Sequence, residues 1–261
     1  MVLNISNIAI ACNNSSNFDS IIKLSKELSA KFNAKLHFIL YENTKIDLSS
    51  KLVGIDYELE TRSSVSYKDL ATRLNEIKPD LLVLSIKIKE SNDGLFTHTE
   101  SCKIIERADK PVLTIPGNYN YEKFSKIVIP IDTSFETRQK GPITIVFAQK
   151  FNANVNIIGV STDKGKDTEV TVANYCRQVS NKIAENGVDN EIEFRLGGNI
   201  TEQTLVYAKE VKAELVVIMT EQEVNFKSFF TGKFSEQFIK QADFPVLSVN
   251  TKDLILSEAR L

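Results

Sequence analysis

The sequence has few of the residues that mark several common classes of protein. Its three cysteines form no C-x-x-C pair, which argues against a disulfide scaffold or a zinc site. The two histidines, His37 and His98, lie in different expected elements with no carboxylate motif beside them, so a metal or acid–base role is not expected. No excess of one charge exists, since 34 acidic residues face 32 basic ones. Binding to nucleic acid or to an anionic membrane therefore has no electrostatic basis.

Long apolar runs and targeting signals are missing as well. No run approaches the ~20 residues of a membrane helix, and residues 1–6 lack a basic stretch followed by an apolar one. We therefore expect a reduced, cytoplasmic protein without membrane or nucleic-acid partners. No nucleophile elbow, zinc-protease helix, P-loop or dinucleotide fingerprint occurs, so no catalytic residue is predicted.

What the sequence does contain is an internal repeat. Lys-Phe-Asn-Ala at 31–34 recurs at 150–153, an offset of 119 residues. Residues 78–84 match 212–218, and residues 108–113 match 242–247, both at an offset of 134. The change of offset places an insertion of 15 residues after the second strand of the second copy. We predict two copies of one domain, residues 1–120 and 121–261, with the second helix of the first copy shortened or absent.

Each copy alternates apolar strands with helical segments. In the second copy we expect strands at 126–131, 155–160, 191–195, 215–219 and 245–249, and helices at 135–151, 169–185, 201–212 and 228–241. Pro142 should kink or restart the first of these helices. In the first copy we expect strands at 5–12, 35–40, 54–60, 81–86 and 111–115. This alternation predicts the α/β fold class, with a parallel, doubly wound sheet in each copy.

Several segments of the second copy carry a family resemblance. They are Ile-Val-Ile-Pro-Ile-Asp-Thr-Ser at 127–134, Glu-Leu-Val-Val-Ile-Met at 214–219, Gly-Lys-Phe-Ser-Glu at 232–236 and Ala-Asp-Phe-Pro-Val-Leu-Ser-Val at 242–249. With them the second copy resembles the universal stress protein family, and the first copy resembles it less closely. The resemblance implies two tandem Rossmann-like or flavodoxin-like domains, each a five-stranded, mainly parallel sheet flanked by helices. It also implies ligand binding at the carboxyl ends of the strands.

The resemblance further implies a weak adenine-nucleotide site in the second copy. The residues it assigns to ATP or ADP are Ile131, Asp132, Thr133, Val160, Gly232, Lys233, Phe234 and Ser235. Among them Asp132 and Val160 would hold the adenosine, and Gly232, Lys233 and Ser235 the phosphates. ATP-binding members of the family share a G-x2-G-x9-G pattern. Only its last glycine is present here, as Gly232, with Met219 and Gln222 at the other two positions. An alternative role for Asp132 is to cap the segment that follows it.

The resemblance also bears on the function of the whole chain. The first copy has Asn13 in place of Asp132 and His98 in place of Gly232, so we expect it to be structural. Members of the family commonly pair through their last strands, which implies pairing of 111–115 with 245–249 inside the chain and a homodimer beyond it. We expect a stress-response or regulatory binding protein rather than an enzyme. The alternatives are an ATP-hydrolysing member, with Asp132 and Ser235 near the phosphates, and a ligand-free structural interaction module.

Overall fold

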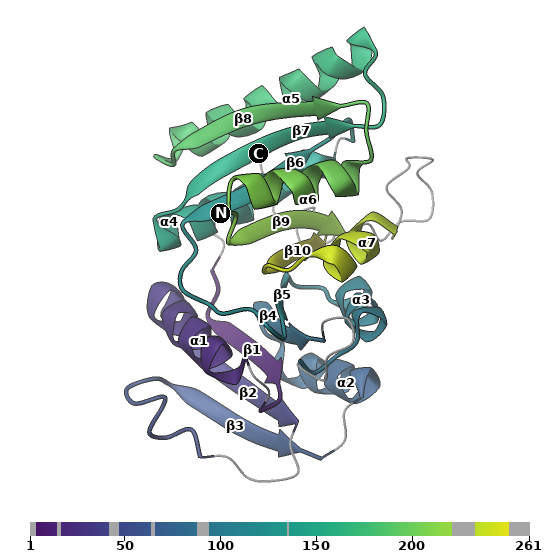
Figure 1. Cartoon of the computed structure of the whole chain (residues 1–261). Helices are drawn as coiled ribbons and strands as arrows, with labels where there is room; N and C mark the ends of the chain where they lie inside the picture. Colours follow the sequence, from purple (N-terminus) through teal and green to yellow (C-terminus); the bar gives the residue numbers. More distant parts are fainter. Residues whose placement is uncertain are drawn as a thin grey trace. The chain divides into compact units, whose positions relative to one another are not determined.

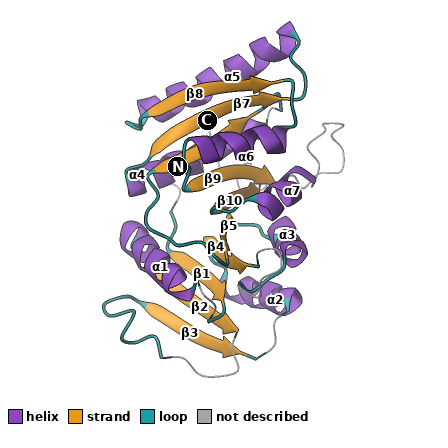
Figure 2. Ribbon diagram, viewed as in Figure 1, coloured by secondary structure: helices purple, strands orange, loops and turns teal. Residues whose placement is uncertain are grey.

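The computed structural model describes residues 4–14, 17–41, 47–63, 66–87, 94–134, 136–220 and 233–250. The chain divides into two compact units (Figure 1), which we call the first unit, Val2–Lys123, and the second unit, Phe124–Leu261. In each unit five parallel strands form a sheet with helices on both faces (Figure 2). The predicted α/β fold class with a parallel sheet in each copy is therefore confirmed.

The first unit is built from eight regular elements in its described part. They are β1 (Asn7–Cys12), α1 (Phe18–Phe32), β2 (Lys35–Tyr41), β3 (Tyr57–Arg62), α2 (Tyr67–Ile77), β4 (Leu81–Ile86), α3 (His98–Arg107) and β5 (Val112–Pro116). Within this unit the strand order is β3-β2-β1-β4-β5. Helix α1 packs on β1 and β2, whereas α2 and α3 pack against each other on the opposite face.

The second unit repeats this order with one more long helix. Its elements are β6 (Lys126–Ile131), the 3-10 helix η1 (Glu136–Lys140), α4 (Gly141–Phe151), β7 (Asn154–Ser161), α5 (Lys166–Glu185), β8 (Asn190–Leu196), α6 (Ile200–Glu210), β9 (Leu215–Thr220), α7 (Lys233–Gln241) and β10 (Val246–Asn250). The strand order is β10-β9-β6-β7-β8. Helices α4 and α5 cover one face and α6 and α7 the other. In the described ranges no helix is both long and apolar enough to cross a membrane.

Burial explains the strand pattern. All six residues of β4 are buried, because a central parallel strand is covered on both faces. The edge strand β8 instead alternates between exposed and half-buried positions. Pro142 restarts the helix as expected, since η1 ends at Lys140 and α4 carries the proline in its first turn, where a missing N–H is tolerated.

The two units differ between their second and third strands. In the second unit the 20-residue helix α5 makes this connection. In the first unit residues 47–56 form turns, and the fully buried Leu48 and Leu52 are the apolar residues this segment contributes to the core. The 15-residue difference read from the repeat thus falls at this connection.

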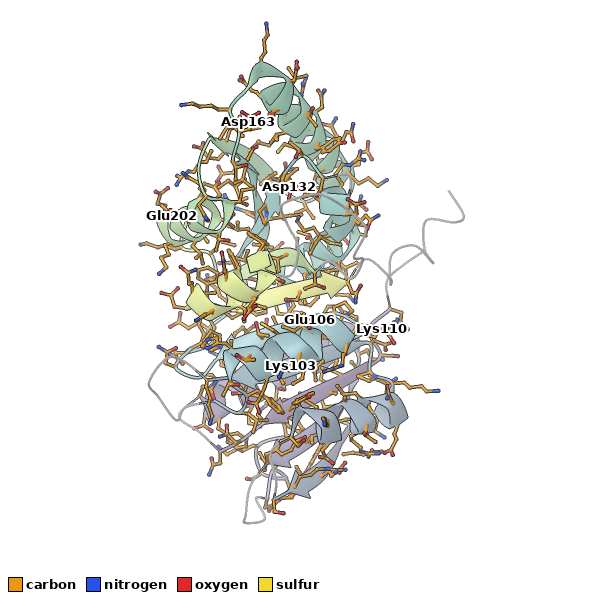
Figure 3. The ribbon with its side chains drawn as sticks, turned by 90° about the vertical axis from the view of Figure 1, so that its right-hand side faces the viewer. Lys103, Glu106, Lys110, Asp132, Asp163 and Glu202 are labelled. Atoms are coloured by element: carbon orange, nitrogen blue, oxygen red, sulfur yellow. The ribbon has the colours of Figure 1, made fainter. Side chains whose placement is uncertain are left out.

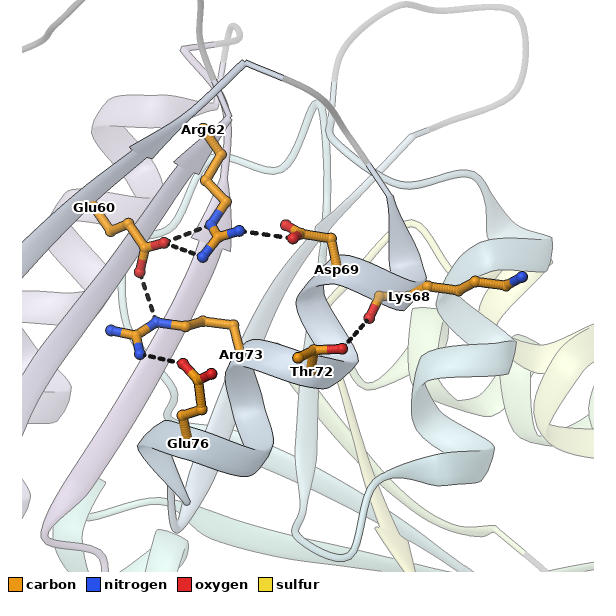
Figure 4. Close-up of polar contacts among 7 residues, drawn as sticks. All are labelled: Glu60, Arg62, Lys68, Asp69, Thr72, Arg73 and Glu76. Carbon is orange, nitrogen blue, oxygen red and sulfur yellow. Dashed lines mark hydrogen bonds and ion pairs between the residues drawn. The ribbon is translucent and has the colours of Figure 1, made fainter.

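Ion pairs attach α2 to the edge strand β3 (Figure 4). Glu60 pairs with Arg62 and, at 2.7 Å, with Arg73 of α2. Arg62 also reaches Asp69 of α2 at 2.6 Å, and Arg73 reaches Glu76 at 2.7 Å. These contacts are only partly buried, so each contributes modestly, although a network of them is stronger than an isolated pair. They hold α2 in place even though Leu70 is its one fully buried side chain.

Candidate functional site

The second sheet has one place where the strand order reverses. Strands β6 and β9 are neighbours, while the chain proceeds from β6 outward to β7 and β8 before returning to β9 and β10. Open α/β sheets bind ligands in the crevice outside the carboxyl ends of the strands at such a point. The residues at these ends are Asp132 after β6, Val160 in β7 and Met219 in β9.

Asp132 holds the turn that leaves β6. Its side chain is buried, at 9% exposure, and its Oδ1 accepts hydrogen bonds from the backbone N of Ser134 at 2.6 Å and from the Ser134 Oγ at 2.5 Å. The backbone N of Asp132 donates to the Thr137 Oγ1 at 3.2 Å. Asp132 therefore stabilises the turn before η1 through Ser134, and it does so at the edge of a cavity.

The cavity has a volume of about 30 Å³ and is lined by residues including Asp132, Thr137, Lys140, Val160, Met219 and Phe234. A volume of this size holds roughly one water molecule. An adenine ring therefore enters only if a lining side chain moves aside. The structure thus brings together three of the residues singled out from sequence: Asp132 directly after β6, Val160 in β7 and Phe234 in α7.

The other candidate residues have different surroundings. Ile131 is fully buried in β6, Thr133 is exposed, and Ser235 is half-buried on α7. None of these three lines the cavity. Gly232 lies outside the described residues, and for Lys233 only its backbone position at the start of α7 is defined.

Lys140 is a site residue that the sequence pattern did not reveal. It ends η1 with a side chain that is only 3% exposed, and its Nζ donates a hydrogen bond to the Thr137 Oγ1 at 3.0 Å. Burial lowers the pKa of Lys140 to about 8, although the charge of Asp132 opposes this shift. Burial raises the pKa of the neighbouring Cys176 thiol, on α5, to about 12. A lysine just before Gly-Pro in a sequence is typical of an exposed helix start, so no signal pointed to its burial.

Acidic side chains surround this edge. Glu136 joins Asp132 and Lys140 in the cavity wall, and Asp163 follows β7 while Glu202 lies in the first turn of α6 (Figure 3). Hydrogen bonds from the Thr168 hydroxyl and the backbone N of Gly165 lower the pKa of Asp163. Among the described residues no three His, Cys, Asp or Glu side chains gather closely enough to hold a metal ion. The edge thus offers hydrogen-bond acceptors, with Lys140 as the cation in the cavity wall.

The same edge of the first unit is covered by its own chain. The Asn13 Nδ2 donates a hydrogen bond to the Gly94 carbonyl at 3.1 Å. Phe96 is fully buried, forms a bridge with Ile86, and places its ring 5.8 Å from that of Tyr41. These contacts occupy the space beyond the ends of β1 and β4.

Comparison with known proteins supports the resemblance. Residues 123–250 match the model of the Universal stress protein family, which confirms the resemblance over this segment. A functionally unknown protein from Pseudomonas aeruginosa PAO1 is 16% identical with a TM-score of 0.70, covering 98% of this chain and 96% of its own. A protein of P. aeruginosa UCBPP-PA14 assigned to the universal stress proteins is 17% identical with a TM-score of 0.71, covering 98% and 97%.

A third solved structure shows the same fold. It is a universal stress protein from Archaeoglobus fulgidus DSM 4304, 13% identical with a TM-score of 0.67, covering 93% of this chain and 98% of its own. At this level of identity the likeness concerns the fold alone. No curated protein matches the chain in sequence.

Proposed function

We propose that this chain is a stress-response or regulatory binding protein of the universal stress protein type, built from two tandem copies. Its second unit binds an adenine nucleotide, ATP or ADP, at the carboxyl ends of β6, β7 and β9. The observation that carries this proposal is that Asp132 and Val160 meet at one cavity at the point where the strand order reverses. The family match over residues 123–250 supports it.

Binding requires the cavity to open. Phe234 closes it from α7, where its ring lies 5.6 Å from that of Phe238. Movement of Phe234 would admit the base beside Val160 and bring the phosphates toward the first turn of α7, which contains Ser235 and whose N-terminal dipole favours anions. Opening this contact and bringing phosphates near Glu136 both oppose binding, so we expect weak affinity.

Asp132→Ala is expected to weaken ATP and ADP binding about tenfold or more, because a hydrogen bond to a charged group contributes about 1.5–3 kcal/mol. The measurement is isothermal titration calorimetry on the full chain. Asp163→Ala is the matched control, since Asp163 also caps a turn at this edge, through the backbone N of Gly165 and the Thr168 Oγ, but does not line the cavity. Asp132→Asn keeps an acceptor for Ser134 and separates the loss of charge from loss of the turn. Equal affinity in Asp132→Ala and wild type would remove Asp132 from the binding site.

The nature of the ligand is tested on the purified chain as isolated. Detection of ATP or ADP by mass spectrometry among the small molecules released by denaturation would support the proposal. Release of inorganic phosphate from added ATP over time would instead support the ATP-hydrolysing alternative. Absence of any released nucleotide, together with no calorimetric binding, would favour the ligand-free interaction module.

We also propose that the first unit is structural with respect to nucleotide, in that the equivalent edge of its sheet binds none. The cover formed by Gly94 and Phe96 over the ends of β1 and β4 supports this role, because it fills the position at which the second unit has its cavity. The pairing of the two copies through their closing strands, and a homodimer beyond it, stay predictions.

A further inference from the structure

A groove of about 450 Å³ lies in the first unit, at the C-terminal ends of α2 and α3. Apolar side chains form most of its wall: Ala71, Leu74, Pro79, Leu82, Ile104 and Ala108. Lys78, Arg107 and Lys110 add three cations, against one carboxylate from Asp109. Sites for small molecules have volumes of roughly 300–1,000 Å³, with mostly apolar walls and a few polar groups. The groove has these properties.

The internal repeat supplies a matched comparison for this groove. At the 134-residue offset, α2 and α3 of the first unit correspond to α6 and α7 of the second. Most wall positions differ between the two units. At Ala71, Ile104 and Lys110 the second unit has the larger apolar residues Leu205, Phe238 and Phe244, whereas Leu74 corresponds to the smaller Ala208. In the second unit the three larger side chains are buried, and the rings of Phe238 and Phe244 lie 6.2 Å apart. At these three positions the second unit therefore buries larger apolar side chains, where the first unit has a groove.

The packing of the two helices agrees with this difference. Helix α6 buries six of its eleven residues, whereas α2, of the same length, buries only Leu70. Ala71 and Leu74 of α2 remain half-buried beside the groove. Apolar side chains left facing a concave surface mark binding sites in soluble proteins.

The charged side chains of the groove indicate which kind of ligand it binds. Arg107 and Lys110 stand where the second unit has Gln241 and Phe244. In the second unit Asp243 pairs with Lys209 at 3.0 Å, but the position of Lys209 is Asn75 in the first unit. Lys78, Arg107 and Lys110 nevertheless outnumber Asp109, so the wall of the groove carries more positive than negative charge. An arginine beside a lysine suits a carboxylate, because the guanidinium can donate two parallel hydrogen bonds to it.

We propose that the groove between α2 and α3 binds an amphipathic carboxylate, with a medium-length aliphatic chain on the apolar wall and its acid group among Arg107, Lys110 and Lys78. The aliphatic chain of the ligand would make apolar contacts like those that Leu205 and Phe238 make in the second unit. This site lies in the first unit and is independent of the nucleotide site proposed for the second.

The test measures binding of decanoate to the full-length chain by isothermal titration calorimetry at low salt. The double variant Ala71→Leu with Ile104→Phe introduces the residues of the second unit and fills the groove. We expect it to lose decanoate binding at least tenfold, while its thermal unfolding temperature equals or exceeds that of wild type, because filling a cavity commonly stabilises. Unchanged decanoate affinity in this variant would overturn the proposal.

Rim variants test the charge without touching the apolar wall. Arg107→Gln, which introduces the residue of the second unit, should weaken decanoate about two- to fivefold, as expected for an exposed ion pair, and reduce the salt dependence of binding. Lys103→Gln is the matched control, because Lys103 is an exposed cation on the same helix (Figure 3) but does not line the groove. Both positions are exposed, so these variants should fold even if the double variant does not.

Three further outcomes count against the proposal. Absence of decanoate binding to the wild-type chain would overturn it. Decyltrimethylammonium binding as tightly as decanoate would contradict the role of the cations. An equal loss of affinity in Lys103→Gln and Arg107→Gln would show that general surface charge, rather than the groove, attracts the ligand.

Discussion

Replacement of Lys140 by methionine is expected to stabilise the second unit by about 2 kcal/mol at pH 7. The pKa of Lys140 falls from 10.5 to about 8 on folding, and a shift of this size corresponds to about 3 kcal/mol against the charged form. Methionine loses the hydrogen bond to Thr137, which contributes about 1 kcal/mol. Its apolar chain has a similar length and carries no charge into the buried site.

The lowered pKa of Lys140 also predicts how the stability difference between wild type and variant changes with pH. Between pH 8 and 10.5 the unfolded lysine keeps a proton that the folded one has released. The unfolded state then binds more protons, so the stability of the wild type rises with pH across this window. The advantage of Lys140→Met should therefore be full below pH 8 and shrink as the pH approaches 10.5.

Urea unfolding of wild type and variant at pH 7 and pH 10 measures the difference. Lys182→Met is the control, because Lys182 is exposed on α5, beside Glu185, and should show no comparable change between the two pH values. A Lys140→Met variant that is less stable than wild type at pH 7 would contradict the expectation. It would show that the ammonium stabilises the turn at β6 by more than its burial costs.

The sequence predicted the strands well because their residues are buried. The expected strands at 81–86 and 126–131 agree with β4 and β6 at both ends, since each is an apolar run with clear limits. The third strand of the first copy was predicted too early, at 54–60, whereas β3 is Tyr57–Arg62. Gly54 instead lies in a turn with φ of +76°, and an edge strand that alternates with charged residues has no continuous apolar run to mark its start.

The candidate site was predictable only in part. Asp132 and Val160 were assigned through the family resemblance, and both lie at the carboxyl ends of strands and line the cavity. The burial of Lys140 depends on α5, where Cys176 is distant in sequence, and local pattern carries no such information. The volume of the cavity depends on which rings lie against it, as Phe234 shows. Likewise the repeat identified equivalent positions in the two units, but only the structure shows that Phe238 is packed near Phe244 whereas Ile104 lines a groove.

Gly94→Ala is expected to destabilise the first unit by about 4 kcal/mol. Gly94 has φ of +97°, and a Cβ at this position would lie 2.2 Å from the Ile86 carbonyl oxygen and 2.7 Å from the Lys87 backbone N. Both neighbours are backbone atoms of the end of β4, so neither can move without disturbing the sheet. The left-handed conformation itself costs an alanine about 1–2 kcal/mol. Displacement of the segment would also break the hydrogen bonds from Asn13 to Gly94 and from Lys87 to Phe96, at about 1 kcal/mol each.

Gly54→Ala separates these two contributions. Gly54 also has a positive φ, of +76°, but a Cβ there would meet nothing within 4 Å, so its substitution should cost only the conformational strain of about 1 kcal/mol. Urea unfolding of the two variants beside wild type measures both effects. Equal destabilisation in the two would show that Gly94 does not pack closely against β4. A larger effect in Gly94→Ala, together with increased binding of a hydrophobic dye as Phe96 becomes exposed, would show that the cover over the ends of β1 and β4 depends on this one close contact between backbones.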